Sequence, residues 1–212
     1  MGAPPDPVHQ VTISYPFWMG RYEVTQAEYE AVLGFNPSWF TGPSIPVEGV
    51  SWISDRLDCK GLTAQHAANL PRGYVYRLPT DAEWEDACRA GTTSNFHYGA
   101  ILACGDARFG LQSCGQNPNG GPVTVGSYVP NAFGVYDTHG NVMEWCLDSY
   151  APYTAAPVTD PFVTGGTDRV LRGGSWASAA SSCRPAHRGF VDPSVYTDSF
   201  GFRIVLAPAR VP

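Results

Sequence analysis

Helical periodicity ends at Gly91, and this feature limits the folds open to the chain more than any other. The stretch from about residue 92 to residue 206 consists of short apolar pieces such as "FHYG", "VTVGSYV", "GVYD" and "GFRIVL", separated by Gly, Pro, Asn and Asp. With 23 Gly and 19 Pro among 212 residues, the pattern predicts short strands joined by long ordered loops. Loops of this kind need metal ions or disulfides besides a hydrophobic core.

The first part of the chain carries clearer helix signals. Thr25 with Glu28 forms a capping box before a helix that Gly34 closes, and Thr80 with Glu83 repeats the pattern in a helix ending at Gly91. A third helix is expected through "SDRLDCKGL", and the opening "HQVTISYPFWMGRYEV" is typical of paired strands. In the second helix, three residues are expected to face inward: Trp84, Ala87 and Cys88. The fold class is therefore α+β, in one domain spanning residues 1–212.

Composition excludes several classes of protein. A net charge of -6, a pI near 5.2 and the lack of Lys or Arg runs argue against a nucleic-acid partner. No apolar stretch approaches the roughly 20 residues of a membrane span, and "MGAPPDPVHQ" lacks the apolar core of a signal peptide. Six cysteines, none in a CxxC pair, favour an extracellular, cell-surface or periplasmic location. Export in turn implies a leader removed upstream, or a chain that is an excerpt of a longer one.

The segment "NAFGVYDTHGNVMEWCLD" gathers the oxygen ligands that a calcium ion prefers. Asp137, Asn141, Glu144 and Asp148 lie within about a dozen residues, and Gly140 lets the backbone turn so that carbonyls face one centre. The spacing is not that of an EF-hand. A turn whose acids cap backbone amides is the alternative interpretation.

Catalytic patterns of other kinds are missing from the sequence. The five histidines, at positions 9, 66, 97, 139 and 187, form no HxH, HExxH or HxxxH grouping for zinc, and no GxSxG occurs. His139 is expected to be a solvent-facing turn residue. Cys183, in "RGGSWASAASSCRPAHR", stays open as a catalytic thiol, a metal ligand or half of a disulfide.

Six motifs together resemble the formylglycine-generating enzyme, or sulfatase-modifying factor, family. They are "FWMGRYEVTQAEYEAVLGFNPSWF", "PVEGVSW", "YRLPTDAEWEDACRAGT", "NAFGVYDTHGNVMEW", "RVLRGGSW" and "SFGFRIV", and the resemblance covers about His9 to Leu206. It implies a fold similar to a C-type lectin domain, with small mixed sheets, two to three helices and extensive ordered loop. "MG" at the start resembles the tail of the family's opening strand motif, which implies an upstream piece.

The same resemblance implies calcium ligands. Asp137 and Glu144 match the family's side-chain ligands, and Gly140 and Val142 match its backbone-carbonyl ligands. A second family calcium would use Asp106, but its other ligands would fall in "QNPNGG", which departs from the family pattern.

For catalysis the resemblance implies two copper-binding thiolates, five residues apart, after the Gly-Gly-Ser-aromatic turn. Soft sulfur ligands select Cu(I), and a serine hydroxyl does not replace them. Ser178 stands at the first position, so only Cys183 is left. Copper is therefore not expected, and the balance leans away from an enzyme.

The resemblance also implies a disulfide between Cys183 and Cys88. That bridge would close a long loop and stabilise the fold by roughly 4 kcal/mol in the chain-entropy picture. Cys104 and Cys114 flank a short loop that a second bridge could close. Cys59 and Cys146 are left, either paired or as buried free thiols.

The leading hypothesis for function is an exported, non-catalytic lectin-like module that binds a protein or glycan, or that builds an assembly with itself, with no membrane insertion. Exposed aromatics of "FTGPSIP" and "RGFVDPSVYTDSF" would form its contact face. The predicted ligand-binding residues are Ser178, Ser182, His187, Phe190 and Tyr196.

Three alternatives stay open. Residues 177–199 resemble the variable segment of ligand-binding proteins diversified by retroelements, which share the lectin-like fold. A metal-dependent oxidase that modifies a cysteine of a protein substrate is the second alternative. An accessory domain of a larger enzyme or secretion system is the third.

Overall fold

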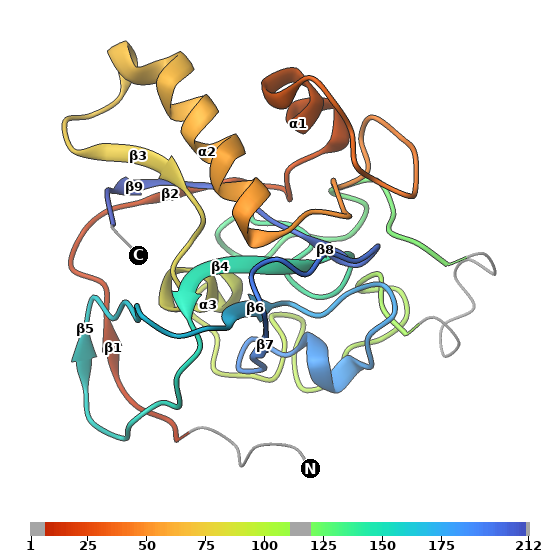
Figure 1. Cartoon of the computed structure of the whole chain (residues 1–212). Helices are drawn as coiled ribbons and strands as arrows, with labels where there is room; N and C mark the ends of the chain where they lie inside the picture. Colours follow the sequence, from red (N-terminus) through yellow and green to blue (C-terminus); the bar gives the residue numbers. More distant parts are fainter. Residues whose placement is uncertain (1–6, 111–119, 211–212) are drawn as a thin grey trace.

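A computed structural model describes residues 7–110 and 120–210 of the chain (Figure 1). The predicted helices form where their caps predicted them. α1 (Gln26–Leu33) begins after the Thr25 capping box and ends at Gly34 in the left-handed conformation. α3 (Asp81–Arg89) begins after the Thr80 box, and its C-cap is Ala90, also left-handed, one residue earlier than expected.

The third helix is longer than its sequence signal. α2 (Trp52–His66) begins after its N-cap Ser51, whose side chain accepts a hydrogen bond from the backbone N–H of Ser54, while the Ser54 hydroxyl accepts one from the Ser51 N–H. Serine at the third position replaces the usual Glu or Gln, which is why the cap was hard to see in the sequence. Two 3-10 turns complete the helical content of the described residues, η1 (Ala67–Asn69) and η2 (Ala180–Cys183).

Nine short strands form three small sheets within the described residues (Figure 1). β1 (Val11–Thr12) pairs in parallel with β5 (Val158–Thr159). β9 (Val205–Pro208) lies between β2 (Trp18–Met19) and β3 (Tyr74–Arg77), antiparallel to both. In the largest sheet, β4 (Met143–Ser149) and β6 (Arg169–Arg172) form the centre, with β7 (Gly189–Val191) and β8 (Phe200–Gly201) at the edges. The chain thus returns its last residues to pair with its first strands.

The core consists of several aromatic clusters joined by buried ion pairs. The main cluster lies between α1, α2 and the central sheet and contains Tyr29, Trp145 and Phe202. Among the largest side chains that are fully buried are three arginines, Arg108, Arg172 and Arg203. Arg172 and Arg203 each bind carboxylates and backbone carbonyls from distant segments. Buried arginines therefore hold many of the long loops, which the sequence had assigned to metal ions and disulfides.

Within the described part of the chain, no helix combines the length and apolar character needed to cross a membrane.

Candidate functional site

The Gly-Gly-Ser-Trp turn follows β6 and depends on its two glycines. Gly173 and Gly174 adopt φ values of 86° and 69°, in the region that side chains disfavour. A Cβ on Gly174 would lie 2.7 Å from the Sγ of Cys183, and one on Gly173 would lie 3.1 Å from the Trp84 ring. The two glycines therefore allow close packing, and the turn lies in direct contact with the Cys183 side chain.

Ser178, at the position of the first family thiolate, has a structural role in this turn. Its hydroxyl accepts a hydrogen bond from the backbone N–H of Ser175 (2.9 Å) and lies 3.1 Å from the Ser175 hydroxyl. Its carbonyl accepts from the N–H of Gly110 (2.9 Å), which ties the turn to a neighbouring loop. Ser178 is half-buried, and it fixes the turn in place of a sulfur ligand.

Cys183 is a buried, protonated thiol. Its side chain is fully buried, packs with Phe96 and Phe109, and lies 3.6 Å from the carbonyl oxygen of Ala179. Burial raises the pKa of the Cys183 thiol to about 12. A metal or a substrate reacts with the thiolate form, which burial disfavours at Cys183.

The expected Cys88–Cys183 disulfide is wrong, because both cysteines are free in the structure. Cys88 belongs to a different cluster, with Trp84, Cys146 and Val170, and its Sγ lies 3.7 Å from the Thr138 carbonyl oxygen. Burial raises the pKa of the Cys88 thiol to about 12 as well. The two thiols thus fill separate parts of the core.

The remaining cysteines follow the other expectations only in part. Cys59 and Cys146 are buried free thiols, one of the two outcomes left open. Cys104 is disulfide-bonded. Its predicted partner, Cys114, lies outside the described residues, so that pairing stays a prediction.

His139 is not the solvent-facing residue that its turn sequence predicted. It is 2% exposed, its Nδ1 lies 2.8 Å from the Cys183 carbonyl oxygen, and its Nε2 accepts from the backbone N–H of His97 (3.3 Å). Its ring stacks on His97 with centroids 4.8 Å apart. Burial, and then the neighbouring His97, lower the pKa of His139 to about 4. The neutral ring therefore joins the 137–144 loop to the segment behind the Gly-Gly-Ser-Trp turn.

The predicted calcium loop is tightly curled and partly unsatisfied. Asp137, Gly140 and Asn141 all have left-handed backbone, with φ of 57°, 91° and 58°. Asp137 Oδ2 accepts from the Gly126 N–H (2.6 Å), whereas its buried Oδ1 has no hydrogen-bond partner. Burial raises the pKa of Asp137. One of the predicted ligand oxygens is thus buried without a donor.

Glu144, the other predicted side-chain ligand, is already engaged. Both its oxygens accept from Arg203 (2.6 Å each), and Oε2 also accepts from the Trp84 indole N–H (2.7 Å). Glu23 lies beside it and accepts from the Asn141 side-chain amide (2.6 Å) and the Val142 N–H (3.1 Å). Burial, followed by the charges of neighbouring Asp137 and Glu144, raises the pKa of Glu23 well above its usual range.

This cluster holds three carboxyl groups, from Glu23, Asp137 and Glu144, around a single guanidinium. No set of three or more His, Cys, Asp and Glu side chains in the described ranges is arranged to hold a metal, but the predicted set has only two side chains and two carbonyls. The excess of buried negative charge and the unpartnered Asp137 oxygen are what a divalent cation relieves. Asp137 thus offers a free oxygen to such a cation, whereas both oxygens of Glu144 are held by Arg203 and Trp84. Asp106 accepts from the Ala103 N–H (2.8 Å) and caps a local turn, while most of "QNPNGG" lies outside the described residues.

The predicted ligand-binding residues are not one cluster. Tyr196 is 59% exposed and stacks on Trp39, itself 57% exposed, with ring centroids 6.2 Å apart and planes inclined by 24°. Phe190 stacks instead on Tyr150, with centroids 4.0 Å apart. His187 is half-buried, and its carbonyl accepts from Arg172 (3.1 Å). Ser182 is half-buried in η2, and its N–H bonds to the Ala179 carbonyl (2.9 Å).

Trp39 lies one residue before "FTGPSIP", the stretch whose aromatics the sequence predicts to be at the contact face. Phe40 in fact packs inward, edge-on to Trp176 with centroids 5.7 Å apart, and Trp176 donates from Nε1 to the Asp198 carbonyl (3.0 Å). The sequence does contain a signal, because Trp39 and Phe40 are adjacent aromatic residues in a Pro- and Ser-containing loop without apolar periodicity. Adjacent side chains in such a loop point in different directions, so when one packs inward the other is exposed.

Together the three small sheets, the few helices and the long ordered loops define a C-type lectin-like domain of the formylglycine-generating enzyme type. Residues 1–208 match the Sulfatase-modifying factor enzyme 1-like domain, and the chain belongs to this family. Its family fold was predicted from the motifs, and that prediction is confirmed.

Proteins similar to this chain carry names that refer to different functions. The chain is 29% identical to a chaperone protein LppX of Paenibacillus barcinonensis, over 92% of this chain and 81% of that protein. It is 32% identical to the formylglycine-generating enzyme of Streptomyces coelicolor, over 89% of this chain but only 60% of the enzyme. Among solved structures, Treponema denticola variable protein 1 (30% identity, TM-score 0.83) covers 94% of this chain and 87% of its own. PvdO from Pseudomonas aeruginosa (29% identity, TM-score 0.83) covers 96% and 85%.

Proposed function

We propose that the chain is a non-catalytic binding module of this family, which recognises a glycan or a protein through a face built around Trp39 and Tyr196. The observation that carries the proposal is the stacked pair itself, since both rings are more than half exposed. Large aromatics are normally buried, and a pair held face to face in solvent gains little stability from that position.

Two further features support this choice over catalysis. The thiol at the family's reactive position is buried and protonated, and its expected partner is a serine that fixes the turn. Rigid stacked aromatics bury large areas on binding at low entropic cost, and both sugar rings and apolar side chains pack on their faces. The recognition face is therefore defined as Trp39, Tyr196 and the exposed residues of the 177–199 segment.

The experiment compares three single variants on a glycan array and against a displayed peptide library. Trp39→Ala and Tyr196→Ala are expected to lose at least tenfold in affinity for any ligand the wild type binds. Trp18→Ala is the matched control, because Trp18 is 56% exposed but lies on β2 beside Tyr74. Equal loss in the control, or unchanged binding in both test variants, would refute the assignment. Thermal unfolding of each variant checks that the folds are equivalent.

A retroelement-diversified ligand-binding protein is the second candidate, and the burial pattern of residues 177–199 favours it. Exposed positions alternate there with buried or half-buried ones, so that Cys183 and Pro185 anchor the segment while residues such as Arg184 and Tyr196 face solvent. Such a segment accepts changes at its exposed positions without disturbing the core. Near-identical gene copies that differ only at those positions would support the idea, and uniform copies would rule it out.

Calcium is a separate part of the proposal. The ion would be held by Asp137, by the carbonyls of Gly140 and Val142, and by Glu144 as far as Arg203 leaves it free. When bound, it would neutralise the surplus carboxylate charge and so order the loop. Calcium is expected to raise the melting temperature of wild-type protein, and Asp137→Ala is expected to abolish that response. No shift with wild-type protein would contradict the site.

We also infer that the protein works in an oxidising compartment, extracellular, at the cell surface or periplasmic. The bonded state of Cys104 supports this inference, because disulfides persist mainly outside the cytosol. Fractionation of the native cells with an antibody to the chain tests it.

A further inference from the structure

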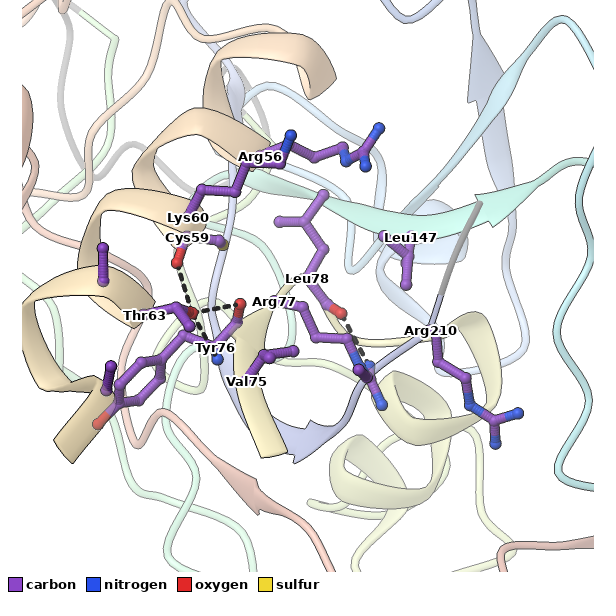
Figure 2. A pocket seen from close by; sticks show the side chains of 13 residues that line it. Arg56, Cys59, Lys60, Thr63, Val75, Tyr76, Arg77, Leu78, Leu147 and Arg210 are labelled. Carbon is purple, nitrogen blue, oxygen red and sulfur yellow. Dashed lines mark hydrogen bonds between the residues drawn. The ribbon is translucent and has the colours of Figure 1, made fainter. Parts of the chain in front are cut away.

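A pocket of about 360 Å³ opens between α2 and β3, on elements that the recognition face does not use (Figure 2). Its walls are mainly apolar and are contributed by Cys59, Ala64, Val75, Leu78 and Leu147. The volume falls in the range of roughly 300–1,000 Å³ that small-molecule sites occupy. The pocket is therefore large enough for an organic ligand.

One face of α2 supplies a whole wall of this pocket. Arg56, Lys60 and Ala64 line it at helical spacing, so their side chains lie in a single stripe, which Ala67 of η1 continues. The acids of the same helix, Asp55 and Asp58, are buried on its other side, toward α1. There the pKa of Tyr29 is raised to about 12, first by burial of the tyrosine and then by the charges of these two acids. The helix thus separates its charges and turns only cations toward the pocket.

The cations at the pocket rim differ in whether a described carboxylate pairs with them. Arg77 is saturated by Glu83, with two contacts of 2.7 Å. In contrast, Arg56, Lys60 and Arg210 take part in no ion pair among the described residues. Arg210 also has a buried Nε without a hydrogen-bond partner. Arg210 already interacts with the Tyr15 hydroxyl and with the charge of the Asp160 carboxylate, so Arg56 and Lys60 are the two rim cations that remain for an anion in the pocket.

Aromatic rings hold the two arginines in place. The guanidinium of Arg56 lies 4.7 Å from the centre of the Trp52 ring, and that of Arg210 lies 5.0 Å from the centre of the Tyr15 ring. Figure 2 shows the two guanidinium groups on either side of Leu147. A guanidinium stacked on a ring keeps its N–H edge available, so Arg56 can still donate to a carboxylate.

We propose that this pocket binds an amphiphilic carboxylate, with its apolar chain against Ala64, Val75 and Leu147 and its carboxylate on Arg56 and Lys60, which stand one helical turn apart on α2. Apolar walls alone would accept any hydrophobic molecule, whereas the unpaired rim cations select an anion. Arginine binds carboxylates through two parallel hydrogen bonds, which a neutral ester or a cationic head group cannot match.

The test is calorimetric titration of the full chain with three probes that share one apolar chain: decanoate, methyl decanoate and decyltrimethylammonium. Decanoate is expected to bind at least tenfold more tightly than either of the others. Arg56→Gln and Lys60→Gln should each weaken decanoate binding about tenfold, as expected for loss of a charged hydrogen bond. Arg72→Gln, an exposed arginine outside the pocket, is the matched control and should leave binding unchanged.

A second variant tests the location independently of charge. Ala64 is solvent-exposed at the pocket wall, so Ala64→Phe fills the pocket without disturbing the core and should abolish binding. Equal affinity for decanoate and its methyl ester, or unchanged binding in Ala64→Phe, would overturn the proposal. So would the absence of any decanoate binding at millimolar concentration. The recognition face plays no part in these measurements, and Trp39→Ala should bind decanoate as the wild type does.

Discussion

Replacing Gly140 with alanine should destabilise the protein far more than the same change at Gly134. Both glycines lie in the 131–144 segment with positive φ, 91° and 76° respectively, and a left-handed alanine costs about 1 kcal/mol. They differ in space, because nothing lies within 4 Å of a Cβ on Gly134, whereas a Cβ on Gly140 would be 2.1 Å from the Arg108 carbonyl oxygen.

The neighbour of Gly140 cannot give way cheaply. The Arg108 carbonyl is backbone and accepts from the Asn141 N–H (2.7 Å), and the Gly140 N–H itself donates to Gly173 (2.9 Å). Moving either segment breaks hydrogen bonds between the 137–144 loop and the Gly-Gly-Ser-Trp turn. Overpacking usually costs about 1–3 kcal/mol, and each lost hydrogen bond about 1 kcal/mol more. We therefore expect a loss of about 3–5 kcal/mol for Gly140→Ala and about 1 kcal/mol for Gly134→Ala.

Urea unfolding followed by tryptophan fluorescence measures both losses, with equal m-values as the check that only stability has changed. A difference below about 0.5 kcal/mol between the two variants would refute the close packing of this loop on Arg108, because the two changes are otherwise alike.

Three other predictions follow from the buried groups. Burial, and then the charge of Asp81, raise the pKa of Asp148 to about 7. The folded state therefore holds a proton that the unfolded state releases above pH 4, and the free energy of unfolding should rise as pH falls from about 7.5 to 5. Urea titrations at pH 7.5 and pH 5 should show that Asp148→Asn reduces this rise in unfolding free energy by about 2 kcal/mol relative to wild type. His139, whose pKa is lowered by folding, reduces stability as pH falls, but it does so equally in both proteins. In a thiol-reagent assay without reductant, Cys59, Cys88, Cys146 and Cys183 should stay unreactive in native protein and all react in denaturant. If Cys88 and Cys183 failed to react in denaturant, the disulfide between them would exist after all. Arg203→Met should cost about 3–5 kcal/mol in urea unfolding, since it leaves the Glu144 carboxylate buried without its cation; a loss below 1 kcal/mol would contradict that pairing.

Local signals allowed the helix starts to be predicted, because a capping box is complete within four residues. The pairs Thr25 with Glu28 and Thr80 with Glu83 carry their own partners, and the structure forms both. The family fold was predictable for a different reason, since six motifs agreed in order and spacing.

Features that depend on distant partners were not predictable in the same way. Cys183 stands where a family disulfide was expected, yet which cluster a thiol enters depends on the packing of Phe96 and Phe109, far away in sequence. His139 looked exposed because its neighbours are turn residues, whereas the segment carrying Cys183 covers it. The stacking of Trp39 on Tyr196 joins two loops, and no local pattern links them.

Titration of purified, reduced protein with Cu(I) against a competing chelator, with oxygen uptake recorded in the presence of a thiol peptide, tests the central claim most directly. A binding module with Ser178 at the first thiolate position and a protonated Cys183 should bind no stoichiometric Cu(I) and consume no oxygen above the peptide blank. One equivalent of tightly bound Cu(I), with turnover that Cys183→Ala abolishes, would show instead that the chain is an oxidase.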